Sequence, residues 1–280
     1  MVSRTLKLLG FLSLAVTTVG CQRGIGGDDS SESQVRAAIT SASTDREDRD
    51  DRGDRDHAEF LPPQPGERVR PQAPDRELRE ILRSIDQRRL ENTVQTLVSF
   101  GTRHTLSSQT DPVRGIGAAT RWAFQQLQGY AAASGGQMTV ALQTFTQPPS
   151  TRIPNPTQIT NIITTLRGST QPDRVYVVSG HIDSRVTDVL NPDAVEPGAD
   201  DDASGVALVM ELARVMSTHK PDATIVFMVV AGEEQGLFGS AFAAAQYKMA
   251  ATDIQGMFSC DIVGASTADD GTRDAHTIRL

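Results

Sequence analysis

Apolar positions follow two different spacings along the chain, and the change of spacing separates expected helices from expected strands. Apolar residues three and four positions apart predict helices at residues 78–85, 90–98, 115–133, 204–216 and 239–250. Short runs rich in β-branched residues predict strands at residues 138–145, 158–166, 174–180, 223–230 and 254–263. Strands that alternate with helices predict an α/β fold, with a mixed, mostly parallel central sheet and helices on both faces.

Three details refine this prediction. Residues 223–230 are nearly all apolar, which is typical of a strand covered on both faces. The helix that starts near Ser204 has a single apolar stripe, so we expect it to pack against the sheet. Asp86 lies where it could cap the second helical segment of the folded part.

The first 21 residues have the pattern of a secretory signal, because Arg4 and Lys7 precede a short apolar run. That run is shorter than the roughly 20 apolar residues that a membrane span needs. Cys21 directly follows Val-Gly, as in a bacterial lipoprotein cleavage box, although Thr18 stands where such boxes usually carry Leu. We therefore expect export from a bacterial cytoplasm, followed either by membrane attachment through a lipid on Cys21 or by secretion.

Residues 22–75 combine Gly, Ser and Pro with dense Asp and Arg of nearly cancelling sign, which predicts a disordered tether. The folded domain is then expected at residues 76–280. The net charge is −8 and the apolar-rich part has no basic stripe, which argues against a nucleic-acid partner. Cys21 and Cys260 are the two cysteines, so no disulfide framework is predicted.

Four short phrases carry the candidate chemistry, and each follows an expected strand or opens an expected helix. They are SGHIDS with His181 and Asp183, GADDDASG with Asp200, Asp201 and Asp202, AGEEQG with Glu233 and Glu234, and SCDIVG with Asp261. The carboxyl ends of strands in an open parallel sheet gather at one edge, so these side chains should converge. One imidazole among several carboxylates suits a divalent ion such as zinc.

His181 and Asp183 alternate on an extended segment, so their side chains should point the same way. We expect His181 to bind metal and Asp183 to hold the tautomer of its imidazole. In GADDDASG, Asp202 or Ser204 could cap the following helix. Capping needs only one residue, and three adjacent carboxylates repel each other unless a cation compensates them. A carboxylate that bridges two metal ions would explain the cluster.

Glu233 and Glu234 follow the apolar strand, where one could bind metal and the other could act as a general base. Asp261 ends a further apolar strand, where burial without a cation would be costly. Cys260 is expected to be a small buried apolar residue rather than a ligand.

Together the four phrases resemble those of the co-catalytic di-zinc aminopeptidase family, which includes bacterial leucyl aminopeptidase, glutamate carboxypeptidase and glutaminyl cyclase. The resemblance extends from Asp86 to Gly264 and includes LVSFGTRHT. It implies two zinc ions and gives each site residue a role. The implied assignments are His181 and Asp261 on one zinc, Asp201 as the bridging ligand, Glu234 on the second zinc and Glu233 as the general base. It also implies a cis peptide between Asp201 and Asp202.

The chain departs from the family pattern in one respect. The family supplies a further His ligand to the second zinc well downstream of the position of Asp261, and His276 follows Asp261 too closely to match it. The resemblance therefore implies that the last part of the domain is missing from this chain.

The resemblance implies a zinc-dependent exopeptidase, and we expect an aminopeptidase whose substrate is a peptide with a free N-terminus. Carboxylate-rich walls favour a substrate that carries an ammonium group. Two alternatives stay open: a metal-dependent dipeptidase or amidohydrolase, and a non-catalytic binding module that retains the fold. GADDDASG argues against the first, and the full acid set from His181 to Asp261 argues against the second.

Overall fold

The computed structural model describes residues 75–267 and 271–273. The predicted signal segment at residues 1–21, the tether up to residue 74 and His276 lie outside the described residues. Among the helices of the described part, none is long and apolar enough to cross a membrane.

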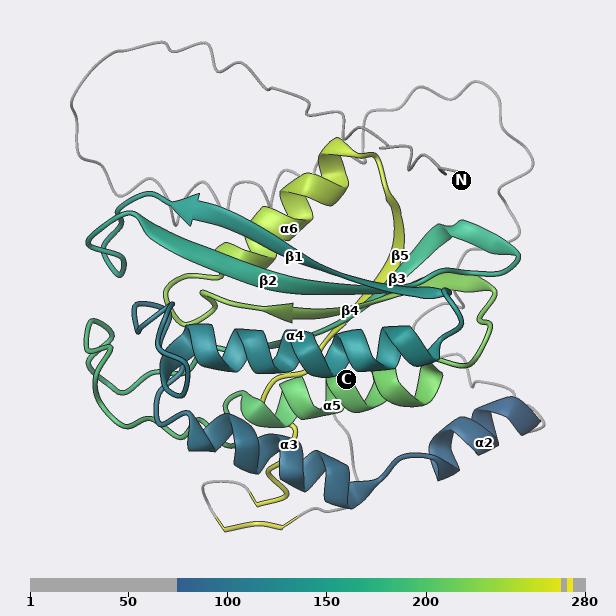
Figure 1. Ribbon diagram of the computed structural model, residues 1–280, viewed down its shortest axis with the longest axis horizontal. Helices are drawn as coiled ribbons and strands as arrows, with labels where there is room; N and C mark the ends of the chain where they lie inside the picture. Colours follow the sequence, from purple (N-terminus) through teal and green to yellow (C-terminus); the bar gives the residue numbers. More distant parts are fainter. Residues whose placement is uncertain (1–74, 268–270, 274–280) are drawn as a thin grey trace, which may run out of the picture. The chain divides into compact units, whose positions relative to one another are not determined.

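A five-stranded mixed sheet organises the described residues (Figure 1). Its strands are β1 (Met138–Gln147), β2 (Thr157–Leu166), β3 (Gln171–His181), β4 (Ala223–Val230) and β5 (Asp253–Ser259), in the spatial order β1-β2-β4-β3-β5. β3 pairs in parallel with β4 and β5, while β2 pairs antiparallel with β1 and β4. β1 therefore runs in the same direction as β3, β4 and β5, and the predicted mixed sheet is confirmed.

Helices cover both faces of the sheet, as predicted (Figure 1). They are α2 (Arg76–Arg83), α3 (Gln87–Ser99), α4 (Gly115–Ala133), α5 (Ala203–Met216) and α6 (Phe238–Met249). α4 and α5 pack on one face with α3 against α5, and α6 lies on the other face. The larger buried apolar cluster lies on the α4–α5 side, and a smaller cluster includes Ala243 of α6.

Local sequence explains where the helices begin. The carboxylate of Asp86 accepts a hydrogen bond from the backbone N–H of Arg88, so Asp86 caps α3 as predicted. Asp202 caps α5 by accepting from the N–H of Gly205. Gly205 also lets the first turn of α5 approach the end of β5, because a Cβ there would lie 2.1 Å from the carbonyl oxygen of Cys260.

β4 and β5 differ sharply in burial. β4 lies inside the sheet and is almost wholly buried, as its apolar sequence predicts. β5 lies at an edge, is mostly exposed and ends at Ser259, so the predicted strand at residues 254–263 was too long. The chain turns after Ser259, with Ile262 at a φ of 50°. Asp261 therefore follows the strand rather than ending it.

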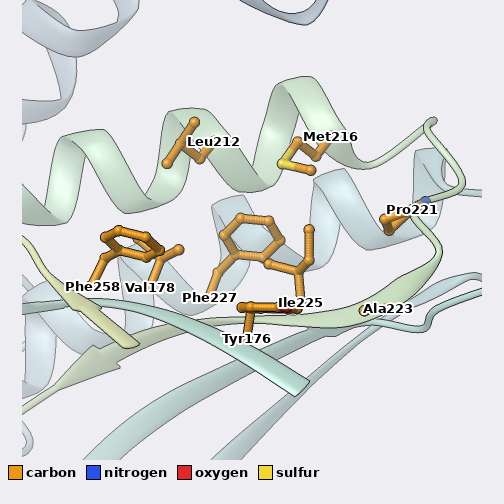
Figure 2. Close-up of a pocket in the computed structure, with 9 residues that line it drawn as sticks. All are labelled: Tyr176, Val178, Leu212, Met216, Pro221, Ala223, Ile225, Phe227 and Phe258. Carbon is orange, nitrogen blue, oxygen red and sulfur yellow. The ribbon is translucent and has the colours of Figure 1, made fainter. Parts of the chain in front are cut away.

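An apolar hollow of about 330 Å³ lies between α5 and the β3–β5 side of the sheet (Figure 2). Its lining includes Tyr176 and Val178 of β3, Leu212 and Met216 of α5, and Phe258 of β5. The lining contains no acidic side chain and no histidine, so this hollow is not where the predicted metal ligands meet.

Candidate metal centre

His181 is the last residue of β3, and its side chain lies at the centre of the carboxylate cluster. The Nε2 atom of His181 is 3.0 Å from Oδ1 of Asp201 and 3.9 Å from Oδ1 of Asp261. The His181 side chain is 4% exposed, whereas those of Asp201 and Asp261 are each 49% exposed. The structure thus brings together the three residues predicted to hold one zinc ion.

The other ring nitrogen fixes the tautomer of His181. Nδ1 lies 3.1 Å from the backbone carbonyl oxygen of Asp183, which can only accept a hydrogen bond. In the neutral ring Nδ1 therefore carries the hydrogen, and the lone pair of Nε2 faces two carboxylates. A lone pair and two anions that converge in this way match the donor set of a zinc site.

The electrostatics of His181 agree with this interpretation. Burial alone would lower the pKa of the imidazole, but the hydrogen bond and charge of Asp183, together with Asp202 and Glu233, raise it to about 10. In the absence of a metal ion, the imidazolium supplies the positive charge that the surrounding carboxylates require. A divalent cation would take over that role.

Asp202 also offers a carboxylate oxygen within 4.8 Å of ligand atoms of His181 and Asp261. Both of its oxygens are already engaged, since Oδ2 accepts from the N–H of His181 and Oδ1 accepts from the N–H of Gly205, each at 2.8 Å. We therefore favour Asp201 as the ligand. The peptide between Asp201 and Asp202 is cis, as the family resemblance implies.

The carboxylate of Asp183 is fully buried and joins three segments of the site. It accepts hydrogen bonds from the hydroxyl of Thr105 at 2.9 Å and from the backbone N–H groups of Glu233 and Glu234 at 3.2 and 3.1 Å. Burial would raise the pKa of Asp183, but His181 and these donors lower it. The carboxylate lies 3.6 Å from Nδ1 of His181, farther than the carbonyl oxygen of the same residue, so the backbone carbonyl is the closer acceptor.

Glu233 and Glu234 follow β4 through Ala231 and Gly232, beside the end of β3. Burial raises the pKa of Glu233; His181 opposes the shift, while Asp183, Glu234 and Asp261 add to it. Glu234 is buried, and its Oε2 lies 2.5 Å from Nε of Arg185. Burial also raises the pKa of Glu234, against the opposing effect of Arg185. The structure therefore pairs Glu234 with a cationic side chain that the sequence pattern did not single out.

The remaining acidic and thiol candidates have other contacts. Asp200 accepts from the N–H of Gly264 through its side chain and from the hydroxyl of Ser204 through its carbonyl. Cys260 is only partly buried, and its backbone N–H donates to the carbonyl of Ser179. The expectation that Asp261 is buried was wrong, because the chain leaves the sheet edge after β5.

Arg103 is the residue that sequence reasoning missed most clearly. It lies within LVSFGTRHT, and its guanidinium is fully buried beneath the site. An isolated arginine in a loop gives no sequence signal of burial, because arginine is almost never fully buried.

Comparison with known proteins decides the family. Residues 161–276 match the family model described as Peptidase family M28. This part of the chain is therefore similar to peptidase family M28. The family resemblance drawn from the four phrases is thereby confirmed, and the M28 region contains His181, Asp201, Glu234 and Asp261.

Curated relatives of this chain carry a consistent description. A "Probable zinc metalloprotease" of Pyricularia oryzae is 53% identical over 226 residues, which cover 80% of this chain and 45% of the relative. A second, from Pyrenophora teres f. teres, is 49% identical, with 80% of this chain and 46% of the relative covered. The chain thus spans about half the length of these relatives.

Solved structures show the same fold. LapB from Legionella pneumophila has a TM-score of 0.53 and 23% identity, with 70% of this chain and 49% of that chain covered. Porphyromonas gingivalis glutaminyl cyclase has a TM-score of 0.51 and 22% identity, with coverages of 66% and 62%. The α/β architecture inferred from the hydrophobic pattern is therefore the fold of these solved structures.

The comparisons correct the predicted localisation. The relatives from Pyricularia oryzae, Pyrenophora teres f. teres and Leptosphaeria maculans are fungal proteins. Export from a bacterial cytoplasm and lipid anchoring at Cys21 were therefore wrong predictions. The Val-Gly-Cys motif at Cys21 is too short to predict lipid anchoring, because a small residue before a cysteine also occurs without any lipoprotein signal.

Proposed function

We propose that this protein is a zinc-dependent aminopeptidase that removes N-terminal residues from peptides. One observation carries the proposal: Nε2 of His181 faces the carboxylates of Asp201 and Asp261, with Glu233 close enough to contribute to the same electrostatic cluster. Similarity to probable zinc metalloproteases supports the choice of metal and of reaction class.

His181, Asp201 and Asp261 would hold one zinc ion, and Asp201 with Glu234 would contribute to a second. When bound, zinc would lower the pKa of a water molecule and polarise the scissile carbonyl. The carbonyl of Asp183 accepts a hydrogen bond from Nδ1 of His181, and its carboxylate accepts from the N–H groups of Glu233 and Glu234. Asp183 therefore fixes the position of the imidazole relative to the segment that carries the two glutamates. Arg185 balances the charge of Glu234.

Glu233 would act as the general base. Its carboxylate would accept a proton from the attacking water and then donate it to the leaving amine. Its raised pKa suits this role, because a base works best when its pKa is closer to the working pH. Glu234 is less suited to proton transfer, since its carboxylate is already paired with Arg185.

The charge of the site favours a free N-terminus on the substrate. Asp201 and Asp261 are half exposed and face the same space as His181. Together with Asp183, Asp202 and Glu233, which also act on His181, they carry more negative charge than one zinc ion would compensate. The remaining negative charge would attract a substrate ammonium group and repel a substrate carboxylate. This difference is the basis for proposing an aminopeptidase rather than a carboxypeptidase.

The test compares amino-acid p-nitroanilides with their N-acetylated forms, each with and without a chelator. We expect hydrolysis of the free-amine substrates, little hydrolysis of the acetylated ones, and loss of turnover on chelation that added zinc restores. Glu233→Ala serves as the control for contaminating peptidases. Equal turnover of both substrate forms would contradict aminopeptidase specificity. Hydrolysis restricted to dipeptides would favour a dipeptidase, and zinc binding without turnover of any peptide would favour a binding module.

A further inference from the structure

Arg103 occupies a distinctive position beneath the metal centre. Its side chain is fully buried in the loop that follows α3, and four hydrogen bonds from its guanidinium go to backbone carbonyls. Nε donates to Ile182 at 2.8 Å and Nη2 donates to Gly198 at 2.8 Å. Nη1 donates to Pro197 at 2.7 Å and to Leu97 at 3.2 Å.

The acceptors lie next to the proposed zinc ligands. Ile182 stands between His181 and Asp183, and Gly198 lies three positions before Asp201. The guanidinium thus joins the end of β3 to the loop that delivers Asp201. Burying a charged group is costly, and burial lowers the pKa of Arg103 to about 10 despite the opposing effect of Asp183 and Asp202. Several charge-assisted hydrogen bonds offset that cost.

Backbone contacts strengthen the same junction. The N–H of Arg103 donates to Oγ of Ser184 at 3.2 Å, and the N–H of Ser184 donates to the carbonyl of Arg103 at 3.4 Å. Gly198 has a φ of +48°, and a Cβ there would lie 2.7 Å from Nη2 of Arg103. A side chain at position 198 would therefore push against the guanidinium as well as strain the backbone.

We propose that Arg103 is a positioning residue for the metal centre, which holds the His181 segment and the Asp201 segment at the separation that zinc binding requires. This inference rests on the proposed zinc function. It assigns to Arg103 a role beyond general stability, because its acceptors belong to the two segments that carry zinc ligands. Lysine cannot replace it, since a single ammonium group lacks the planar set of donors that reaches several carbonyls.

The experiment measures zinc affinity with a competing chelator for the wild type, Arg103→Lys and Leu127→Ala. Leu127 is a fully buried residue of α4 in the main core, so its truncation lowers stability without removing a bond to either ligand segment. We expect Arg103→Lys to lose about 10–100-fold in zinc affinity, as is usual when a residue supporting metal ligands is changed. Leu127→Ala should bind zinc within about twofold of the wild type, on the principle that distant sites act independently.

A second readout uses the metal-free protein. The N–H of Ala203 donates to the carbonyl of Gly198, the same carbonyl that Arg103 holds. Amide exchange at Ala203 should be faster in Arg103→Lys than in Leu127→Ala when both are compared at equal global stability. Ser184→Ala removes the acceptor of the Arg103 N–H, which is a smaller change at the same junction. It should also lower zinc affinity and speed amide exchange at Ala203, so it tests the inference if Arg103→Lys does not fold.

The outcomes separate this inference from the proposed function. Unchanged zinc affinity and unchanged exchange at Ala203 in Arg103→Lys would overturn the positioning role, as would equal losses in Arg103→Lys and Leu127→Ala. A wild type that binds no zinc would instead refute the proposed function, and the positioning of zinc ligands with it, whatever the exchange at Ala203.

Discussion

The two halves of the proposed metal centre are held in different ways. The inner half consists of His181, Asp183 and Glu234, which are buried and tied to neighbouring segments by hydrogen bonds or an ion pair. The outer half consists of Asp201 and Asp261, whose side chains are 49% exposed and whose ion pairs both go to Nε2 of His181.

This contrast shows where a metal ion would contribute. The protein itself fixes the inner half, because Asp183 joins three segments through backbone and hydroxyl donors. The outer half has two carboxylates that converge on one nitrogen, so a cation would stabilise it most. Changes in the inner half should therefore affect both folding and zinc binding, whereas changes in the outer half should affect zinc binding with little effect on folding.

The largest expected effect concerns Glu233, the proposed general base. Glu233→Ala should reduce kcat by about 10²–10⁴-fold, the usual contribution of a general base, while zinc content stays nearly unchanged. Steady-state kinetics and metal analysis of the same preparation check both parts. Glu233→Gln is the matched control, because it keeps the size of the side chain and removes the basic oxygen. Normal turnover of either variant would refute the assignment.

The next effect compares one carboxylate from each half in the metal-free protein. Asp183→Ala leaves the hydroxyl of Thr105 and the N–H groups of Glu233 and Glu234 without their acceptor, so we expect a loss of about 3–5 kcal/mol in the free energy of unfolding. Asp261→Ala should change it by less than about 1 kcal/mol, since its side chain is half exposed.

Denaturant unfolding in the presence of a chelator measures both values. Similar losses for the two variants would show that the halves do not differ in the way described.

A smaller effect is expected when zinc is present. At a free zinc concentration of 100 times Kd, binding should stabilise the wild type by about 2.7 kcal/mol. Asp261→Ala should lose most of this gain. Asp253→Ala is the matched control, because Asp253 is an exposed acid at the start of β5, the strand that Asp261 follows. Thermal unfolding with and without zinc decides it: an equal gain in Asp261→Ala and Asp253→Ala would remove Asp261 from the ligand set.

Much of the fold could be predicted because long elements repeat a simple pattern. The apolar run of β4, the cap at Asp86 and the helix at residues 115–133 follow from local sequence and occur as expected. β5 was harder, because apolar residues continue past Ser259 although the chain turns there. An edge strand has one neighbour, so its end is set by the partner strand rather than by its own sequence.

The convergence of Asp201 and Asp261 on His181 could be predicted from the sequence, but the contacts that hold the surrounding segments together could not. Clustered carboxylates beside a histidine indicate a cation, and this signal is local. The pairing of Arg185 with Glu234 and the bonds from Arg103 to backbone carbonyls join segments far apart in sequence. Such contacts form only when the chain folds, so the spacing of residues in the sequence does not predict them. The choice of Asp201 rather than Asp202 as the proposed zinc ligand likewise depends on folding. It rests on the finding that both carboxylate oxygens of Asp202 accept hydrogen bonds from backbone N–H groups.

Zinc titration of the purified protein, with His181→Ala in parallel, tests the central claim most directly. The account predicts one tightly held zinc per wild-type chain, because His181, Asp201 and Asp261 provide the three protein ligands that a catalytic zinc site uses, whereas Asp201 and Glu234 provide only two. His181→Ala should lose that tight binding. Tight zinc binding that persists unchanged in His181→Ala would contradict the proposed metal centre.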